Sequence, residues 1–131
     1  MKDTRTLPST AAGVVDVSSP IVVGVVNATP DSFSDTGDRS TAGAIRTVHS
    51  HLEDGARIIE VGGESNVTNR PAVSAAEEIS RVTPVVEAAV AAGATVSIDT
   101  YKPEVAEAAL SAGAAIVNDI SGSDRREMLA V

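Results

Sequence analysis

The sequence predicts an α/β fold built from parallel strands that alternate with helices. Three observations predict it. Short apolar, β-branched runs end abruptly on an amide or a carboxylate, amphipathic stretches separate these runs, and a Gly-Ala pair follows each stretch, at 55–56, 93–94 and 113–114. Alternating units of this kind form a parallel sheet whose strands end at one common rim. The polar strand ends are therefore expected to form a ligand site.

The first unit begins with a nearly continuous apolar run at 21–26 that stops at Asn27. Such a run is typical of a strand buried on both faces of a parallel sheet. Residues 28–41 are dense in Pro, Gly, Asp and Ser, which predicts a long polar loop. A helix over 42–54 follows, because apolar residues recur there at helical spacing and Gly55 suits its end.

The later units repeat this pattern. The expected strands are 58–60, 95–99 and 115–118, and the expected helices are 74–92, one that begins at Pro103, and the start of another at 124–131. In the helix over 74–92, Val82 and Val86 mark the apolar side, and Glu77 and Glu78 are expected on its other sides. Periodicity alone allows a doubly wound sheet or a TIM barrel, and the polar strand ends favour the barrel.

Four units would be the first half of a (β/α)8 barrel, because a complete one needs about 250 residues. We therefore predict parallel (β/α) units forming a half barrel over 21–131, preceded by a flexible leader over 1–20 that is rich in Ser, Thr, Pro and Ala. The two outer strands of such a half barrel would have open edges, so we expect a homo-oligomer.

Composition excludes several classes of protein. The formal net charge is −8 and the basic residues are scattered, so nucleic acid is not expected as a partner. The absence of cysteine excludes disulfides and thiolate metal sites. No apolar run is long enough to cross a bilayer, and we expect no membrane partner and a cytoplasmic location. No nucleophile elbow, Walker loop or dinucleotide fingerprint is present.

The segment 27–35 has the highest local density of ligand-type groups, with Asn27, Asp31 and Asp35 in and beside one loop. Such oxygen groups suit a hydrated Mg²⁺, or a diphosphate that arrives with one. The alternative is a well-capped turn in which Asp31 or Ser32 bonds nearby backbone amides. On composition alone, the two interpretations are equally good.

Asp99 and Asn118 end the third and fourth strands. A carboxylate and an amide on neighbouring strand tips can read the edge of an amino-substituted planar heterocycle. The alternative is that Asp99 or Asp119 caps the next helix, which we prefer for Asp119. Glu60 is a buried carboxylate by pattern, for which a structural hydrogen bond is at least as good an explanation as catalysis.

Two further features have simple structural explanations. Gly62 and Gly63 allow a close backbone approach to a ligand, but a Gly-Gly pair by itself is weak evidence and a plain turn explains it better. His49 and His51 are two residues apart on a helix and do not share a face, so a zinc pair is not expected and both are predicted to be solvated.

At these residues the chain resembles the dihydropteroate synthase family of folate biosynthesis. The matching segments are VVNATPDSFSDTG (25–37), IIEVGGES (58–65), TVSIDT (95–100) and AAIVNDISG (114–122). The resemblance implies a pterin-binding TIM barrel. In this family, para-aminobenzoate attacks a dihydropterin methyl diphosphate and pyrophosphate leaves with Mg²⁺. The substrates would be these two small molecules.

The resemblance also assigns expected roles. Asn27 matches a metal and diphosphate residue, and Asp99 and Asn118 match residues that hold the pterin. The loop over 29–37 matches a loop that closes over the substrates, so Asp31 and Asp35 are the expected catalytic residues. Ser65, Asn66 and Arg70 of the second loop are the expected further substrate contacts.

The chain departs from the family in three places. Glu60 stands where the family has Asp, the second loop reads NVTNRP at 66–71, and the chain stops at Val131, before the family's later pterin and diphosphate residues. We therefore expect the polypeptide by itself to bind weakly and catalyse little. The rival interpretations are a pterin-binding methyltransferase domain and a non-catalytic half-barrel paralogue that self-associates.

Overall fold

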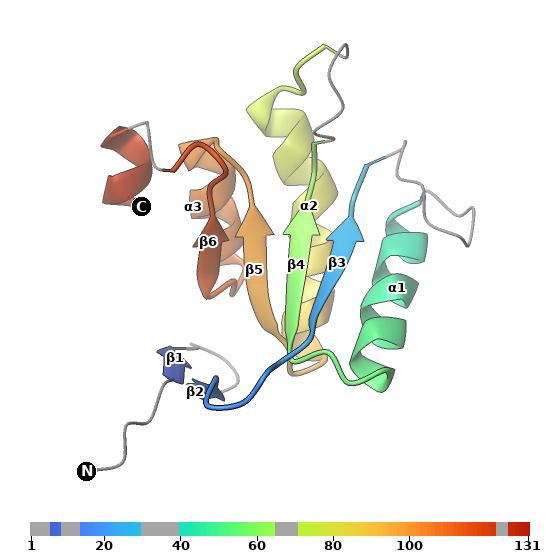
Figure 1. The fold of residues 1–131 in the computed structure, drawn as a ribbon. Coiled ribbons are helices and arrows are strands. Elements are labelled where there is room, and N and C mark those ends of the chain that lie inside the picture. Colours follow the sequence, from blue (N-terminus) through green and yellow to red (C-terminus); the bar gives the residue numbers. More distant parts are fainter. Residues whose placement is uncertain (1–5, 9–13, 30–39, 65–70, 123–125) are drawn as a thin grey trace.

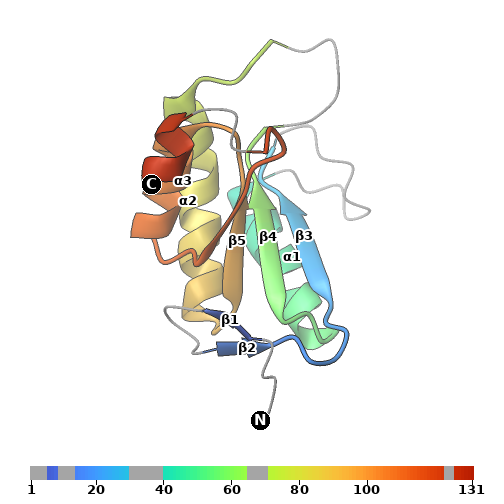
Figure 2. The ribbon, with the colours of Figure 1, turned by 60° about the vertical axis from the view of Figure 1, so that its left-hand side comes forward.

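A parallel four-stranded sheet covered by helices on one face forms the centre of the protein (Figures 1 and 2). The computed structural model describes residues 6–8, 14–29, 40–64, 71–122 and 126–131. The elements in chain order are β1 Thr6–Pro8, β2 Val14–Asp16, β3 Val23–Asn27, α1 Thr41–Glu53, β4 Ile58–Gly62, α2 Ala75–Ala91, β5 Thr95–Asp99, α3 Pro103–Ser111, β6 Ile116–Asn118 and the 3-10 helix η1 Arg126–Ala130.

The strand order is β3-β4-β5-β6, and every neighbouring pair is parallel. The predicted α/β class with alternating parallel units is thus confirmed, and the expected helices and strands agree with the observed ones to within one or two residues at most ends. The predicted helix over 124–131 is instead a short 3-10 helix in its described part, η1.

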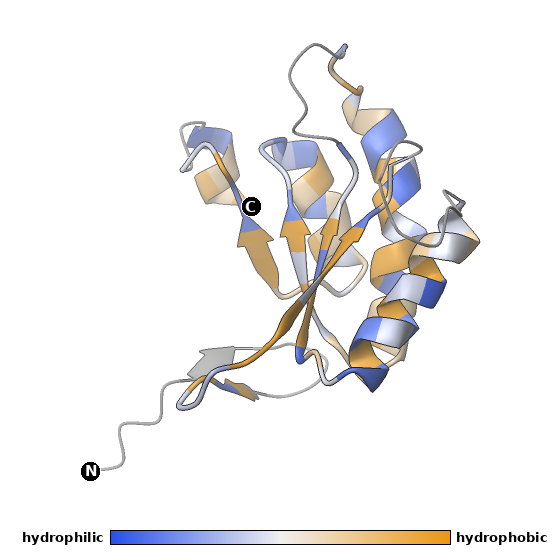
Figure 3. Ribbon diagram, turned by 45° about the vertical axis from the view of Figure 1, so that its right-hand side comes forward, coloured by the Kyte–Doolittle hydropathy of each residue, from blue (hydrophilic) through white to orange (hydrophobic). Residues whose placement is uncertain are grey.

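The core lies between the sheet and the three α-helices. Side chains from the covered face of the strands meet buried residues of α1, α2 and α3, and most of them are Val, Ile or Ala. The strands are mostly hydrophobic along their length (Figure 3). Ile59, Val61, Val96 and Ile98 are all at most 1% exposed. Small aliphatic side chains therefore fill a core that lacks large aromatic residues.

Strand β3 differs from its predicted burial on both faces. Its residues alternate between exposed and buried, with Val26 buried but Val23 and Val25 44% and 53% exposed. The helices cover only one face of the sheet, so alternate side chains of this edge strand have no helical layer above them (Figure 2). The expectation of two buried faces was wrong for this strand.

Helix α2 also differs from prediction, because Glu78 is on its buried side. Glu78 is 1% exposed, and it is one turn before Val82 on the face that packs against the sheet. The sequence pattern had placed it among the solvated residues. A buried carboxylate requires partners, which are described below with the site.

Each α-helix ends in the same hydrogen-bonded turn. Gly55, Gly93 and Gly113 have φ angles of 96°, 86° and 107°, which only glycine adopts without strain. The alanine after each glycine donates its backbone N–H to the carbonyl five residues earlier, as in Ala56 N to His51 O at 2.9 Å. The recurrent Gly-Ala pairs of the sequence are therefore three Schellman turns that lead into β4, β5 and β6.

The segment before the sheet contains two short strands. β1 and β2 pair antiparallel, with Leu7 opposite Val15. The prediction of a flexible leader over 1–20 did not anticipate this pairing, because the Pro and Ala residues of this run are depleted in strands. The domain boundary at residue 20 stays a prediction. Within the described residues, no helix is both long and apolar enough for a membrane span.

Candidate functional site

A row of four residues crosses the sheet at its carboxyl end. Asn27 of β3 pairs in register with Gly62 of β4, Gly62 with Asp99 of β5, and Asp99 with Asn118 of β6. Residues in register on parallel strands direct their side chains to the same face. The three predicted site residues Asn27, Asp99 and Asn118 therefore lie on one rim and on the face that the helices do not cover.

Gly62 leaves a gap in the middle of this row. A Cβ atom at Gly62 would lie 3.9 Å from Asn27 Oδ1 and 3.8 Å from Asp99 Oδ2. Both distances are ordinary van der Waals contacts, so the two oxygens flank the place where a side chain would be. The missing side chain gives a ligand access to the amide and the carboxylate at the same time.

Glu60 lies on the same face two residues before Gly62, and it contacts Asn118. Asn118 Nδ2 donates a hydrogen bond of 2.8 Å to Glu60 Oε1. The half-buried Glu60 is thus hydrogen-bonded, which agrees with the structural explanation predicted for it. Because its amide nitrogen donates to Glu60, Asn118 presents its carbonyl oxygen as an acceptor at the rim.

The electrostatic environment of the rim is negative. Burial raises the pKa of the Asp99 carboxyl, and the nearby charges of Glu60, Glu78 and Asp119 raise it further. Asp119 itself accepts hydrogen bonds from the backbone N–H and hydroxyl of Ser121, at 2.9 and 2.7 Å, so it caps a turn and not the helix that we expected. The rim therefore favours a ligand that brings hydrogen-bond donors.

A planar heterocycle with adjacent ring N–H and amino groups has such a donor edge. The rim offers carboxylate oxygens from Asp99 and Glu60 and a carbonyl oxygen from Asn118, all acceptors. Among the described residues, no group of three His, Asp or Glu side chains could hold a metal ion. Asn27 alone supplies one oxygen, which suits a Mg²⁺ that keeps its waters and binds through a ligand's phosphates.

Five other predicted site residues lie outside the described parts of the chain. They are Asp31, Asp35, Ser65, Asn66 and Arg70. The described residues next to them are Thr29, which is buried after β3, and Glu64, which is two residues after β4. Both of these described positions adjoin the carboxyl ends of the strands.

His49 is exposed, as expected, but His51 is not simply solvated. The His51 Nε2 atom lies 3.1 Å from the carbonyl oxygen of Val25, and the imidazole packs over Gly24 of β3. A Cβ atom at Gly24 would approach the His51 side chain to 2.8 Å. His51 therefore packs α1 against the edge strand and belongs to no metal site in the described residues.

The sequence interpretation missed a charged cluster beside the rim. Lys102 Nζ donates to Glu64 Oε2 at 2.6 Å, to Glu78 Oε2 at 2.7 Å and to the carbonyl oxygen of Val73 at 2.7 Å. Two signals pointed to it: a carboxylate one turn before Val82 on the apolar side of α2, and a lysine directly before the first residue of a helix, where a cation is unfavourable.

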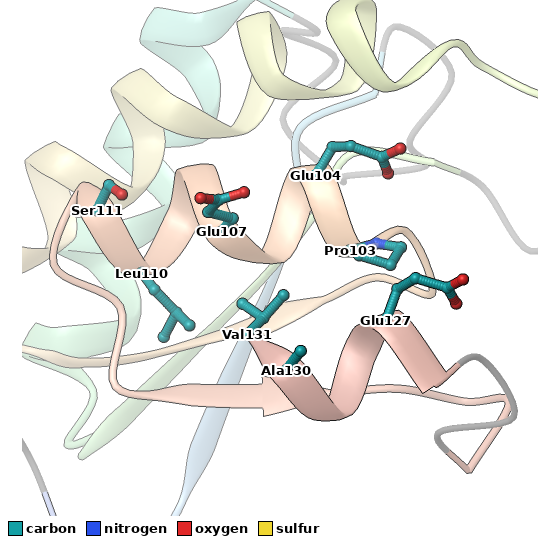
Figure 4. Close-up of a pocket in the computed structure, with 8 residues that line it drawn as sticks. All are labelled: Pro103, Glu104, Glu107, Leu110, Ser111, Glu127, Ala130 and Val131. Atoms are coloured by element: carbon teal, nitrogen blue, oxygen red, sulfur yellow. The ribbon is translucent and has the colours of Figure 1, made fainter.

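A groove between α3 and η1 is separate from the rim (Figure 4). Three carboxylates, Glu104, Glu107 and Glu127, line it together with Leu110 and Val131. None of the rim residues lines this groove. It offers like charges without a described counter-ion and adds nothing to the candidate site.

Comparison with known proteins gives a consistent result. The model of the family described as "Pterin binding enzyme" matches residues 23–131. A dihydropteroate synthase of Streptococcus pyogenes is 47% identical over 121 residues, which are 90% of this chain and 45% of that protein.

Two solved structures align closely with the fold. The dihydropteroate synthase of Xanthomonas albilineans with 4-aminobenzoic acid has a TM-score of 0.85 at 39% identity, covering 95% of this chain and 47% of that one. The enzyme of Burkholderia cenocepacia complexed with 7,8-dihydropteroate has a TM-score of 0.80 at 35% identity, covering 95% and 41%. The chain thus spans less than half the length of these relatives and matches part of their barrel.

Proposed function

Because the chain belongs to the pterin-binding enzyme family, we propose that it supplies the pterin-binding rim of a dihydropteroate synthase. The observation that supports this most is the row Asn27, Gly62, Asp99 and Asn118 at the carboxyl ends of four parallel strands. In (β/α) barrels, residues at these ends carry the chemistry. The relatives are named for this activity, and two of them are in complex with 4-aminobenzoic acid and 7,8-dihydropteroate.

Asp99 and Asn118 would hold the pterin ring by its donor edge. Asp99 accepts from the ring N–H and amino groups, and Asn118 adds a carbonyl acceptor whose orientation Glu60 fixes. The negative charges around Asp99 favour donors and disfavour a ligand edge made only of acceptors. This arrangement would select a 2-amino-4-oxo heterocycle over isosteres that lack the amino group.

Asn27 is the residue that would contribute to Mg²⁺ binding, with its side-chain oxygen at the rim, on the other side of Gly62 from Asp99. A bound Mg²⁺ neutralises the charge of a diphosphate and so makes it a better leaving group. One protein oxygen is enough for an ion that is bound mainly by water and phosphate. Asp31 and Asp35 are proposed to act in the first loop near this group.

The proposed reaction joins two substrates at one carbon. The amine nitrogen of para-aminobenzoate forms a bond with the methylene carbon of the dihydropterin, the carbon–oxygen bond to the diphosphate breaks, pyrophosphate leaves, and the amine loses one proton. The protein's part is to orient the two substrates and shield the carbon from water. Ser65, Asn66 and Arg70 are proposed as further contacts to them.

The four-stranded sheet alone presents this rim with one uncovered face and with β3 and β6 as outer strands of the described sheet. Water therefore reaches the site from that face, which weakens polar contacts with a ligand. We expect the 131-residue chain to bind a dihydropterin weakly and to turn over little. A fusion that adds the remaining barrel units of the Streptococcus pyogenes relative should close the face.

Two measurements test the proposal. In NMR titration of the chain with 6-hydroxymethyl-7,8-dihydropterin, the amide signals of Glu60, Asp99 and Asn118 should shift, while those at the opposite end of the strands should not. The fusion should release pyrophosphate only when para-aminobenzoate, the dihydropterin diphosphate and Mg²⁺ are all present.

The same fusion with Asp99→Asn should lose this activity, because the amide presents a donor where the pterin needs an acceptor. Methyl transfer from an intact folate without pyrophosphate would favour the methyltransferase alternative. A titration that leaves the rim signals unmoved at millimolar ligand would refute the proposal itself.

A further inference from the structure

The β4–α2 connection, residues 63–74, begins and ends beside one buried cation. At its start, Glu64 accepts from Lys102 Nζ at 2.6 Å, and near its end the carbonyl of Val73 accepts from the same nitrogen at 2.7 Å. Glu64 Oε1 also accepts the backbone N–H of Val73 at 3.2 Å. The lysine thus joins two points that are nine residues apart in the chain.

Helix α2 and the neighbouring Thr100 also hold Lys102 in place. Glu78 of α2, only 1% exposed, accepts from Lys102 Nζ at 2.7 Å, and the backbone N–H of Lys102 donates to Thr100 Oγ1 at 3.1 Å. Lys102 is itself 8% exposed, and its ammonium lies 5.0 Å from the centre of the Tyr101 ring. All three donors of the ammonium are therefore used within the protein.

Helix α2 adds a second attachment to the same connection. Arg81 Nη1 donates to the carbonyl of Gly63 at 3.2 Å, and a Cβ atom at Gly63 would come within 2.7 Å of Glu78 Cγ. The backbone of the connection thus lies directly against the helix that carries Glu78. Gly62, the central residue of the rim, immediately precedes this point.

We propose that Lys102 is a positioning residue that holds both ends of the β4–α2 connection at the rim. Its place in the chain supports this. A lysine at the N-cap of α3 offers no side-chain acceptor to the helix and puts a positive charge at the positive end of the helix dipole. A role for the ammonium elsewhere explains why a lysine is present at this position.

The charges of the cluster agree with this role. Burial alone lowers the pKa of Lys102, but hydrogen bonds from Lys102 to Glu64 and Glu78 raise it above the ordinary value. Burial likewise acts to raise the pKa of Glu64, and hydrogen bonds from Lys102 and the Val73 backbone bring it below the ordinary value. Glu64 and Lys102 thus both stay ionised at neutral pH.

The consequence for binding rests on the proposed function. The connection starts directly after Gly62, so a displacement of its first residues also moves the backbone of Gly62, which lies between Asn27 and Asp99. A displacement of about 1 Å at a binding site is enough to cost affinity or rate. Loss of the cluster should therefore weaken dihydropterin binding although Lys102 is not proposed to touch the ligand.

The pKa of Lys102 can be measured by NMR with little signal overlap, because lysine occurs only at positions 2 and 102. With lysine labelled at the Cε carbon, two signals are expected, and that of Lys102 should report a pKa above the ordinary lysine value. Glu78→Gln should lower the pKa of Lys102. The matched control Glu77→Gln, which removes an exposed neighbour paired with Arg81, should leave it unchanged.

The positioning itself is measured by hydrogen exchange. Lys102→Met leaves Glu78 buried without a counter-ion, so the double variant Lys102→Met/Glu78→Gln is the better test of a folded chain. Exchange at the Val73 amide should become about tenfold faster in it, whereas amides of β5 should keep their rates. Lys102→Arg, which retains charge and donors, should restore much of the protection.

Unchanged exchange at Val73 in the folded double variant would overturn the proposal. So would wild-type affinity for 6-hydroxymethyl-7,8-dihydropterin in a variant whose Val73 exchange has risen. If the unmodified chain shows no dihydropterin binding at all, the proposed function fails, and the exchange and titration results still decide whether Lys102 positions the connection.

Discussion

At the scale of single residues, the rim depends as much on a missing side chain as on those present. Gly62 separates Asn27 and Asp99 across the sheet, and both contribute an oxygen within 4 Å of the place where its Cβ would be. The hydrogen bond from Asn118 to Glu60 then fixes the orientation of the Asn118 side-chain amide. Each of these contacts can be changed by one substitution without touching the core.

Gly62→Ala should separate binding from stability. The added methyl group makes only ordinary contacts, at 3.8 to 3.9 Å, so the free energy of unfolding should change by about 0.5 kcal/mol or less. The methyl group would occupy the space between the two oxygens, and affinity for a dihydropterin should fall. Calorimetric titration and a thermal melt on the same sample check both outcomes, and full affinity in the stable variant would contradict our account of the rim.

Asp99→Asn should stabilise the fold while it removes function. Burial, then Glu60, raise the pKa of this carboxyl, so the folded state holds its proton to a higher pH than the unfolded chain. Wild-type stability therefore falls as pH rises from the unfolded to the folded pKa of Asp99. The variant should melt at a higher temperature than wild type at pH 7, by a difference that shrinks as the pH is lowered and Asp99 becomes protonated.

The control for this prediction is Asp119→Asn, which removes the smallest of the three charges that raise the pKa of Asp99 and also changes the carboxylate that caps a turn through Ser121, so it should stabilise the chain less than Asp99→Asn. An Asp99→Asn variant that melts below wild type at pH 7 would contradict the prediction, because it would show that the folded protein stabilises the Asp99 carboxylate. Dihydropterin binding should be lost in Asp99→Asn in either case, as stability and function trade against each other at such a site.

At the scale of elements, α2 connects the core to the rim. Its buried face carries Val82, Val85, Val86 and Ala89 toward the strands, and one turn earlier Glu78 reaches Lys102. The helix can lie this close to the β4–α2 connection only because Gly63 has no side chain. The neighbouring glycines thus differ in purpose, since Gly62 leaves space for a ligand and Gly63 leaves space for a helix.

Gly63→Ala should destabilise the fold by about 1–3 kcal/mol, the usual cost of overpacking. Its Cβ would come within 2.7 Å of Glu78 Cγ and Val82 Cγ1, so α2 or the connection must move. Chemical denaturation measures the change, with Gly62→Ala as the matched control one residue away. Equal stability of the two variants would mean that α2 is free to shift at no cost.

At the scale of the whole molecule, helices cover one face of the sheet, and β3 and β6 are its outer strands. Val23 and Val25 are exposed on the other face. Outer strands that pair with no further strand of the described sheet and carry exposed apolar side chains promote association. The expected homo-oligomer thus has a structural reason and stays a prediction.

The purified chain should form dimers or larger species in sedimentation velocity experiments, in proportions that rise with concentration. Val25→Lys places a charge on the exposed side of β3 and should shift the distribution toward monomer without lowering the melting temperature, because this side chain is 53% exposed. A cooperative melt from a strict monomer at every concentration would contradict the predicted half barrel.

The periodic features of the chain could be predicted from sequence because they are local. Apolar runs, helical spacing and Gly-Ala pairs located the elements, and the rule that parallel strands end at one rim brought Asn27, Asp99 and Asn118 together. The predicted burial of β3 on both faces failed because an apolar run does not reveal how many layers cover it. That depends on the whole sheet.

The Lys102 cluster could not be predicted in the same way. Its members come from the β4–α2 connection, α2 and the residue before α3, and they are up to 38 positions apart. Only the tertiary fold brings the buried Glu78 and the half-buried Glu64 to the single buried lysine of the described residues. The sequence held only indirect signs, a charge in an apolar stripe and a cation at a helix start.

The three Schellman turns have an evolutionary consequence. In each turn, two adjacent residues are enough to reverse the direction of the chain. The end of the sheet opposite the rim therefore forms from local hydrogen bonds, without contacts between residues distant in the sequence. Mutations in the loops of the other end can then accumulate without endangering the path of the chain. New ligand specificities can therefore evolve at the carboxyl ends of the strands while the turns at the opposite end maintain the fold.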